Sequence, residues 1–208
     1  QITQANAILQ DTFGYDQFRQ GQEEIIAALL DGTSILAVMP TGSGKSLCFQ
    51  IPALIMEGLT VVVSPLVALM EDQVAALRLA GVPAETINSS RTYGDNAGSW
   101  RQVAAGACPI LYISPERLMT ERMLVALSKL PLRLFAIDEA HCISRWGPAF
   151  RPDYQDLQNL KNRFPDVPVA AMTATADTLT RADIAQRLFG EEGRTFVSGF
   201  DRSNIRLN

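Results

Sequence analysis

The sequence has very few residues of the kinds that bind zinc or form disulfides. Its 208 residues include one histidine, His141, and three cysteines, Cys48, Cys108 and Cys142. The cysteines are far apart and odd in number, and none belongs to a Cys-x-x-Cys pair. A structural zinc site is therefore not expected, and a reducing compartment is indicated. Cys48 and Cys142 are expected to be small buried apolar residues and not reactive thiols.

The sequence also lacks a long apolar run and an excess of positive charge. No stretch reaches the roughly eighteen apolar residues of a membrane-spanning helix, so no membrane partner is expected. The N-terminus has no basic segment followed by an apolar block, so it does not resemble a signal peptide. Lysine and arginine total 18 against 22 acidic residues, a net charge of −4. This argues against a generally basic nucleic-acid coat, although it is compatible with a local basic groove.

What the sequence does contain is a regular alternation of strand-like and helix-like segments. Apolar residues make up 47% of the chain, enough for a sizeable core, and the length suits one α/β domain. The alternation predicts a parallel sheet with helices on both faces and ligands at the carboxyl ends of the strands. Continuous helices are expected from about 116 to 130 and over 153–164, and a mobile loop over 89–99. Strands are expected at 35–39, 60–63, 84–88, 110–113, 132–137, 167–172 and 194–197.

One Gly-rich segment between a predicted strand and a predicted helix has the composition of a phosphate-binding loop. Glycines let backbone N–H groups converge on phosphate oxygens, and the helix N-terminus adds partial positive charge. Lys45 is expected to reach the β- and γ-phosphates of a nucleotide, and the Ser46 hydroxyl to bind Mg²⁺. Met39 occupies the position of the usual first glycine, and an incidental Gly-rich turn with a lysine is the alternative. The segment reads Pro40-Thr41-Gly42-Ser43-Gly44-Lys45-Ser46.

Two adjacent carboxylates follow another apolar strand. Asp138 is expected to hold Mg²⁺ through water or together with Ser46, because Mg²⁺ takes few protein oxygens and keeps several waters. Glu139 is expected to orient and deprotonate an attacking water. An acidic helix N-terminus is the alternative for an isolated Asp-Glu pair. The P-loop upstream favours the functional interpretation.

These two motifs, Pro40–Ser46 and Asp138-Glu139-Ala140-His141, resemble those of superfamily 2 helicases, and the fuller set resembles the RecQ DNA helicases from Leu9 to Asn208. The resemblance implies a RecA-like P-loop NTPase domain that uses ATP and Mg²⁺. It implies that residues 1–200 form the first RecA-like lobe and that 201–208 begin the linker to a second lobe. The catalytic residues that it implies are Lys45, Asp138, Glu139 and His141.

A segment ahead of the P-loop resembles the adenine-reading motif of the RecQ family. It contains Phe13-Gly14-Tyr15, Phe18-Arg19 and Gly21-Gln22. By this resemblance, Gln22 hydrogen-bonds the adenine edge, Tyr15 stacks on the ring and Arg19 supports the nucleotide. An isolated Tyr15 and Phe18 could equally staple two helices together. The nucleotide-binding residues that the resemblance and the P-loop together imply are Tyr15, Arg19, Gln22 and Thr41, Gly42, Ser43, Gly44, Lys45, Ser46.

Other segments resemble the DNA-contacting and coupling motifs of the same family. Ser64–Val74 and Ser114–Leu118 resemble two DNA-contacting motifs, and Cys142–Pro152 resembles the aromatic-rich loop. Bases stack on exposed aromatic side chains, and arginines meet phosphates. The loop departs from the family pattern, because Pro148-Ala149 stands where His-Asp is usual. The implied DNA-binding or coupling residues are Arg145, Trp146, Phe150, Arg151, Thr173 and Thr175.

The resemblance implies the motor lobe of a 3′-to-5′ DNA helicase that couples ATP hydrolysis to translocation on single-stranded DNA and to unwinding, in DNA repair and recombination. Its partners would be single-stranded and partly duplex DNA and a second lobe in the same protein. The expected location is the cytoplasm, at the bacterial nucleoid, or the nucleus in a eukaryote. These 208 residues alone are expected to bind nucleotide without unwinding DNA. Two alternatives are a passive nucleotide- and DNA-binding module and a P-loop ATPase that translocates without unwinding.

Overall fold

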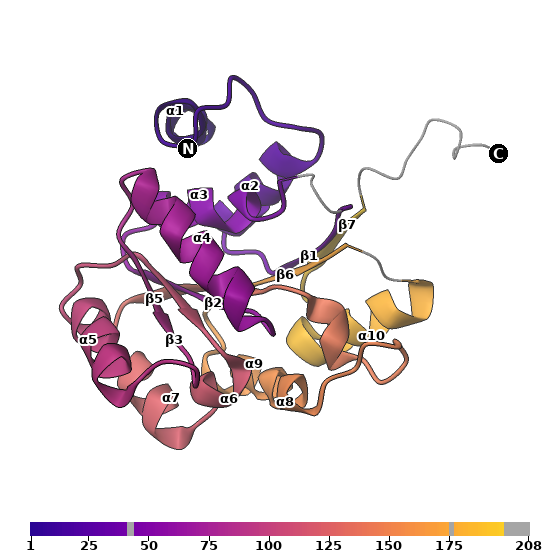
Figure 1. Ribbon diagram of the computed structural model, residues 1–208. Coiled ribbons are helices and arrows are strands. Elements are labelled where there is room, and N and C mark those ends of the chain that lie inside the picture. The colour runs from indigo at the N-terminus through magenta and orange to yellow at the C-terminus, as the bar shows by residue number, and fades with distance from the viewer. Residues whose placement is uncertain (41–43, 175–176, 198–208) are drawn as a thin grey trace.

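The computed structural model describes residues 1–40, 44–174 and 177–197, and within them a seven-stranded sheet runs through the middle of the molecule (Figure 1). The strand order is β3-β4-β2-β5-β6-β1-β7, and each neighbouring pair is parallel. The predicted α/β class and parallel sheet are thus confirmed. The strands are β1 (Ile35–Val38), β2 (Leu59–Val63), β3 (Ala84–Ile87), β4 (Ile110–Ile113), β5 (Leu132–Ile137), β6 (Val169–Thr173) and β7 (Arg194–Val197).

Successive residues of each central strand enter two different apolar clusters, one on each face of the sheet. This alternation explains why the strands are almost continuously apolar, as expected of a parallel sheet buried on both faces. One face is covered by α2 (Gln22–Leu30), α3 (Leu47–Ile55) and α4 (Val67–Leu79), with α1 (Ile2–Asp11) packed outside α2 and α3. The other face is covered by α5 (Tyr93–Ala104), α6 (Pro115–Leu118), α7 (Glu121–Ser128), η1 (Ala140–Ile143), α8 (Pro152–Gln155), η2 (Asp156–Asn159), α9 (Leu160–Arg163) and α10 (Thr178–Phe189).

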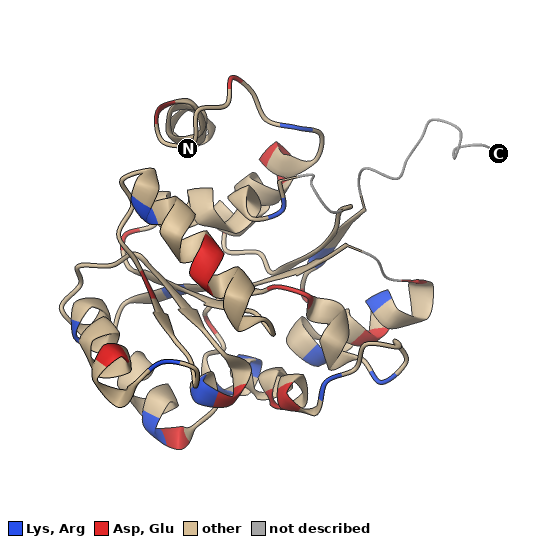
Figure 2. Ribbon diagram, in the orientation of Figure 1, with Lys and Arg blue, Asp and Glu red and all other residues tan. Residues whose placement is uncertain are grey.

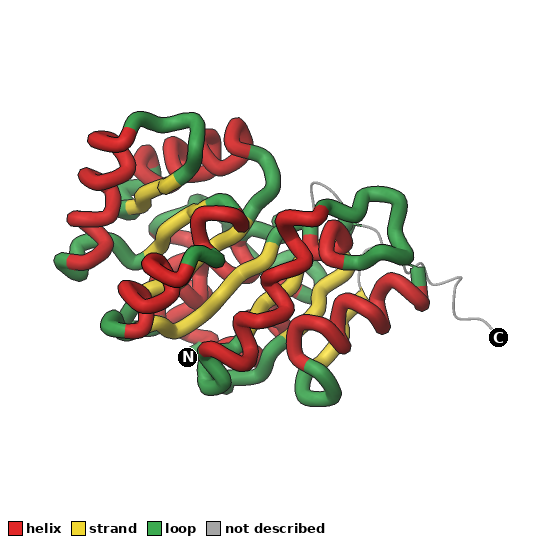
Figure 3. Tube along the Cα trace, turned by 90° about the horizontal axis from the view of Figure 1, so that it is seen from below, coloured by secondary structure: helices red, strands yellow, loops and turns green. Residues whose placement is uncertain are grey.

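The figures show this layered arrangement from two directions. In Figure 1, α3 and α4 lie above the sheet, and α7, α8 and α9 lie below it. Figure 3 shows the strands side by side, with helices packed across them. Charged residues of both signs are interspersed over the surrounding helices and loops (Figure 2). This mixture agrees with the absence of a strong overall charge in the sequence.

The predicted mobile loop at 89–99 is wrong, because most of it belongs to α5. The Thr92 side chain caps this helix by accepting a hydrogen bond from the Asp95 backbone N–H. The buried Asn96 side chain accepts from the Asn88 N–H at 3.2 Å and donates to the Asn88 carbonyl at 2.9 Å. Polar residues that resembled a solvated loop therefore form a helix cap and buried hydrogen bonds.

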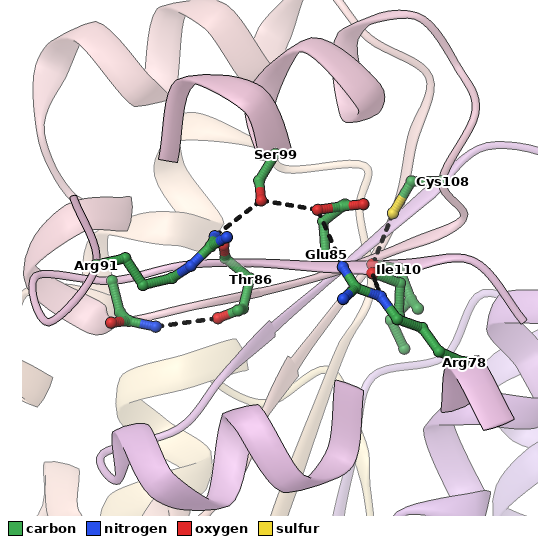
Figure 4. Close-up of polar contacts among 9 residues, drawn as sticks. Arg78, Glu85, Thr86, Arg91, Ser99, Cys108 and Ile110 are labelled. Atoms are coloured by element: carbon green, nitrogen blue, oxygen red, sulfur yellow. Dashed lines mark hydrogen bonds and ion pairs between the residues drawn. The ribbon is translucent and has the colours of Figure 1, made fainter. Parts of the chain in front are cut away.

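A polar network also attaches α5 to the edge strand β3 (Figure 4). Arg91 donates hydrogen bonds to the Thr86 carbonyl and, at 2.8 Å, to the Ser99 hydroxyl. Ser99 in turn donates to Glu85 at 2.7 Å, and Glu85 forms an ion pair with Arg78 of α4 at 3.2 Å. The network joins α5 and α4 through the edge strand between them.

The two long predicted helices are each divided into shorter pieces. α6 ends at Leu118, and Thr120 caps α7, because its hydroxyl accepts a hydrogen bond from the Met123 backbone N–H. In the second region, α8, η2 and α9 replace one continuous helix. Tyr154, Leu157 and Leu160 are all buried against the sheet. Their spacing of three matches a 3-10 helix, and this spacing explains the tighter winding of the segment.

The cysteines behave as the sequence indicates. Cys48, Cys108 and Cys142 are buried and free of disulfides. Burial raises the pKa of the Cys48 thiol to about 12 and that of Cys142 to about 11. Among the described residues, no helix has the length and apolar character needed to cross a membrane. The predicted linker at 201–208 lies outside the described residues.

Candidate functional site

The sequence motifs meet at the carboxyl edge of the sheet. The P-loop follows β1, Asp138 follows β5, and Thr173 ends β6, which lies between those two strands. The Met39 backbone N–H donates to the Thr173 carbonyl at 3.0 Å, so the pairing of β1 and β6 continues to the residue before the P-loop. The expectation that the polar motifs share one edge of the sheet is therefore confirmed.

Gly44, near the end of the P-loop, is in close contact with the Gln22 side chain. Its φ is +80°, and a Cβ atom there would lie 2.3 Å from the Gln22 amide nitrogen. The positive φ favours glycine here, and any larger residue would also displace the Gln22 amide. The buried Gln22 amide donates to the Gly44 carbonyl at 3.0 Å and accepts from the Arg19 backbone N–H at 2.7 Å. Thr41, Gly42 and Ser43 lie outside the described residues.

The residues assigned to adenine recognition surround one small cavity beside the P-loop. The cavity has a volume of about 130 Å³. Tyr15 is half-exposed beside it, whereas Phe18 packs into the apolar contact between α1, α2 and α3. The staple interpretation therefore applies to Phe18 and not to Tyr15. Gln22 holds the P-loop backbone, and its contact with adenine stays a prediction. The lining residues are Leu9, Tyr15, Gln17, Arg19, Gln22, Gly44 and Leu47.

Asp138 is a nearly buried carboxylate in an electrostatically mixed environment. Its side chain is 7% exposed, and one oxygen accepts from the Glu139 backbone N–H at 2.9 Å. Burial raises the pKa of Asp138, the positive charge of Lys45 opposes this rise, and the Glu139 carboxylate adds to it. A desolvated carboxylate beside a lysine is a typical functional-site arrangement.

The side chains at this edge offer oxygen donors of the kind that Mg²⁺ takes. No group of three or more His, Cys, Asp and Glu side chains converges on a metal position in the described part of the chain. Mg²⁺ needs only one or two protein oxygens when phosphates and water supply the rest. Asp138 and the Ser46 hydroxyl, at the ends of the two motifs, provide oxygen donors of this kind.

Glu139 has an unusual backbone conformation. Its φ is +52°, and among the described residues no other non-glycine has a positive φ. Such strain is often stored at functional sites. The turn places the Glu139 carboxylate 3.5 Å from His141 Nε2, while His141 Nδ1 lies 2.7 Å from the Thr173 hydroxyl. His141 therefore connects the Glu139 carboxylate to the end of β6.

The aromatic-rich loop presents one large exposed side chain from an anchored backbone. Trp146 is 68% exposed, and its backbone N–H donates to the Ser144 hydroxyl at 3.1 Å. Ser144 in turn donates to Asp183 of α10 at 2.7 Å. The Arg145 guanidinium lies 4.8 Å from the centre of the Phe150 ring. These contacts fix the loop while leaving Trp146 accessible.

The two arginines of the loop already have partners in the chain. Arg145 donates to Gln155 at 2.9 Å, and Arg151 forms an ion pair with Asp153 at 3.4 Å. Both contacts involve partly or fully exposed groups, so they are weak and exchangeable. The roles of these arginines toward DNA stay predictions. Thr175, the last residue assigned to coupling, lies outside the described residues.

Comparison with known proteins places this chain in a family. Residues 19–183 match the DEAD/DEAH box helicase family. The chain belongs to the DEAD/DEAH box helicases. Its DEAH segment is Asp138-Glu139-Ala140-His141.

Curated relatives confirm the resemblance to RecQ helicases. The ATP-dependent DNA helicase RecQ of Haemophilus influenzae is 48% identical over 97% of this chain. The RecQ helicase of Bacillus subtilis is 43% identical over 98% of it. The chain spans about a third of the length of these relatives, 33% and 35% respectively.

Solved helicase structures share the fold. The DUF1998 helicase MrfA has a TM-score of 0.71 at 21% identity, over 94% of this chain and 32% of that one. The Hef helicase domain of Pyrococcus furiosus has a TM-score of 0.68 at 20% identity, over 90% of this chain and 39% of that one. At these identities the likeness concerns the fold, which is the RecA-like fold predicted from the sequence.

Sequence reasoning missed Tyr154 as a residue that supports the DEAH segment. Tyr154 lies on α8, just beyond the aromatic-rich loop, and is completely buried. Its hydroxyl donates to the backbone carbonyl of Asp138 at 2.8 Å. An apolar-facing tyrosine on a helix gives no sign in the sequence of a specific polar partner. The contact holds the backbone between Asp138 and the strained Glu139.

Tyr154→Phe is expected to lower the free energy of unfolding by about 1–3 kcal/mol. The ring keeps its packing, but the buried Asp138 carbonyl loses its donor. Chemical denaturation of the whole protein measures the effect, with Tyr93→Phe as the control because Tyr93 is exposed on α5. Equal stabilities of the two variants would show that the hydroxyl contributes nothing here.

Asp138→Asn is expected to stabilise the nucleotide-free protein at neutral pH. Because the pKa of Asp138 is raised on folding, the folded state binds this proton more tightly than the unfolded state, and stability falls as pH rises between the two pKa values. Asparagine removes the charge and keeps an oxygen that accepts from the Glu139 N–H. Each kcal/mol gained should raise the midpoint of thermal unfolding by about 2–4 °C.

The pH dependence supplies the control for Asp138→Asn. The stabilisation should shrink in acid, where the wild-type carboxyl is itself protonated in the folded state. Asp166→Asn, at an exposed turn, should show no such gain. A lower midpoint for Asp138→Asn at neutral pH, or a gain that grows in acid, would contradict the electrostatic account.

Proposed function

We propose that this chain is the ATP-binding motor lobe of a 3′-to-5′ DNA helicase of the RecQ type. The observation that carries the proposal is the meeting of the P-loop and the Asp138-Glu139 pair at one edge of the sheet. The similarity to RecQ helicases over nearly the whole chain supports the same conclusion. The whole protein would couple ATP hydrolysis to translocation on single-stranded DNA and to unwinding, in repair and recombination at the bacterial nucleoid or in the nucleus.

Each residue of the site has a separate role in ATP hydrolysis. Lys45 binds the β- and γ-phosphates, and Ser46 and Asp138 hold Mg²⁺. The metal supplies neutralisation of the charge that develops on the phosphates. Glu139 orients the attacking water and takes its proton, and its contact with His141 fixes the carboxylate. The cavity beside Tyr15, Arg19 and Gln22 receives the base.

The same edge of the sheet connects the nucleotide to DNA. Trp146 offers an exposed ring on which a base stacks, and Arg145 and Arg151 exchange their intrachain partners for phosphates. The contact between His141 and Thr173 lies between Glu139 and the end of β6, where the coupling motif begins. A second RecA-like lobe in the same protein would complete the ATP site; the relatives are about three times longer than this chain.

Glu139→Gln in the whole protein is expected to retain Mg²⁺-dependent ATP binding while turnover falls about 10²–10⁴-fold. The amide keeps the size of the side chain and its contact with His141, but it cannot take a proton. Lys45→Ala should lose ATP binding itself. Steady-state ATPase with single-stranded DNA, together with nucleotide binding, measures both effects.

The matched control for Glu139→Gln is Glu191→Gln, an exposed residue after α10. It should behave as wild type in both assays. Wild-type turnover in Glu139→Gln would remove Glu139 from the mechanism. Loss of ATP binding by Glu139→Gln would show that the carboxylate acts in binding and not in proton transfer.

Trp146→Ala is expected to reduce the stimulation of ATPase by single-stranded DNA and to leave basal turnover intact. The side chain is exposed, so its truncation removes a stacking surface worth about 1–3 kcal/mol per base without disturbing the core. Pro148→His combined with Ala149→Asp should raise the stimulation, because proline lacks a backbone donor and a polar side chain. ATPase measured against DNA concentration gives all three curves.

Two outcomes of this experiment would contradict the proposed coupling. If Trp146→Ala leaves the curve unchanged, the loop does not sense DNA in this protein. If wild type shows no stimulation and the double variant restores none, the passive nucleotide- and DNA-binding module becomes the better description. A strand-displacement assay then separates an unwinding enzyme from an ATPase that translocates without unwinding.

A further inference from the structure

We propose that Gln73 of α4 is a positioning residue for the Ser46 hydroxyl, and through it for the Mg²⁺ bound with the nucleotide. The inference rests on the proposed function, because it concerns the metal of the nucleotide site. Gln73 lies two turns into α4, on the side of the helix that faces α3 and the start of the P-loop helix. Its amide nitrogen donates to Ser46 Oγ at 3.1 Å.

Gln73 is the third member of a chain of side-chain hydrogen bonds that ends at Ser46. Gln50 of α3 donates to the Tyr112 hydroxyl at 2.9 Å. Tyr112 of β4 donates to the Gln73 amide oxygen at 2.6 Å. Gln50 and Tyr112 are buried, with 7% and 1% of their surface exposed. Residues from two helices and one strand therefore form a continuous chain of hydrogen bonds to one hydroxyl group.

The chain of donors determines how the Gln73 amide is oriented. Burial raises the pKa of Tyr112, so its hydroxyl keeps the proton that it donates. That hydroxyl accepts from Gln50 and has one proton, which it gives to the Gln73 oxygen. With the oxygen of Gln73 held by Tyr112, its NH₂ group faces Ser46. The orientation is thus fixed by buried groups and not by solvent.

The orientation of the Gln73 amide determines which lone pair of the Ser46 hydroxyl is free to bind a metal ion. A serine hydroxyl has one proton and two acceptor positions, and its rotation is otherwise free. The Gln73 N–H occupies one acceptor position and leaves the other for Mg²⁺. Partners that orient a metal ligand in this way typically account for about 10–100-fold in metal affinity or activity. Gln73 acts through Ser46 and does not touch the metal.

The test compares nucleotide binding by the full-length protein with and without Mg²⁺. Gln73→Met keeps the length of the side chain and removes the donor. Fluorescent ADP is titrated in EDTA and then at increasing free Mg²⁺. Gln73→Met should raise the Mg²⁺ concentration needed for half-maximal strengthening of binding about tenfold or more. Its affinity for ADP in EDTA should equal that of wild type.

Two further variants make the comparison specific. Tyr112→Phe leaves Gln73 and Ser46 in place but removes the group that orients the amide. It should shift the Mg²⁺ midpoint in the same direction by a smaller factor, and it carries the test if Gln73→Met does not fold. Gln102→Met makes the same substitution at an exposed position of α5 and should match wild type.

The outcomes separate this inference from the proposed function. An unchanged Mg²⁺ midpoint in Gln73→Met, with wild type responding to Mg²⁺, would overturn the inference and leave the proposed function standing. An equal loss of ADP affinity with and without Mg²⁺ would overturn it too, since Gln73 would then only support the P-loop. Wild-type protein that binds ADP without any response to Mg²⁺ would overturn the proposed metal site and the inference together.

Discussion

The carboxylate of Asp138 is nearly buried directly after the end of β5. Burying a charged group in this way costs folding free energy, and it raises the pKa of Asp138. The surrounding structure offsets part of this cost. The Glu139 N–H donates to the carboxylate, the charge of Lys45 favours its ionised form, and Tyr154 satisfies the backbone carbonyl of the same residue. The pKa of Asp138 is nevertheless raised, so burial outweighs these favourable contacts in the nucleotide-free chain.

The parallel sheet explains how groups far apart in the sequence reach this carboxylate. β6 lies between β1 and β5, so the end of β6 contacts both Met39, which precedes the P-loop, and His141 of the DEAH segment. The Thr173 carbonyl accepts a hydrogen bond from the Met39 N–H, and the Thr173 hydroxyl contacts His141. Thr173 therefore links the residue before the P-loop to the DEAH segment. The aromatic-rich loop joins the same region, because its Ser144 is bound to α10.

Much of this arrangement could be predicted from the sequence. Several apolar strands are followed directly by a polar motif, and the carboxyl ends of parallel strands must share one edge. The helix at 93–104 could not be predicted, because Thr92, Asn96 and Ser99 resemble loop residues until their partners are known. Its cap and buried hydrogen bonds depend on tertiary packing, which local composition does not encode.

The supporting contacts of the site were out of reach for a similar reason. Tyr154 donates a hydrogen bond to Asp138, and Gln73 donates one to Ser46. The partners in each pair are far apart in the sequence, and only the fold brings them together. Gln22 is the opposite case, because the sequence indicates that the residue is important and the structure shows a further contact with the P-loop backbone. Its amide donates to the Gly44 carbonyl and lies where a side chain at that position would have to displace it. Sequence motifs thus indicate which residues are important, but they do not show which partners those residues contact.

A crystal structure of the whole protein with Mg²⁺ and a non-hydrolysable ATP analogue tests the central claim most directly. The account predicts the β- and γ-phosphates within hydrogen-bond distance of Lys45 Nζ, and Mg²⁺ about 2.0–2.1 Å from Ser46 Oγ. Asp138 should lie at the metal directly or through one of its waters, and a water should lie beside Glu139. A nucleotide bound away from the edge formed by β1, β6 and β5, or a metal without Ser46 and Asp138 beside it, would contradict the account.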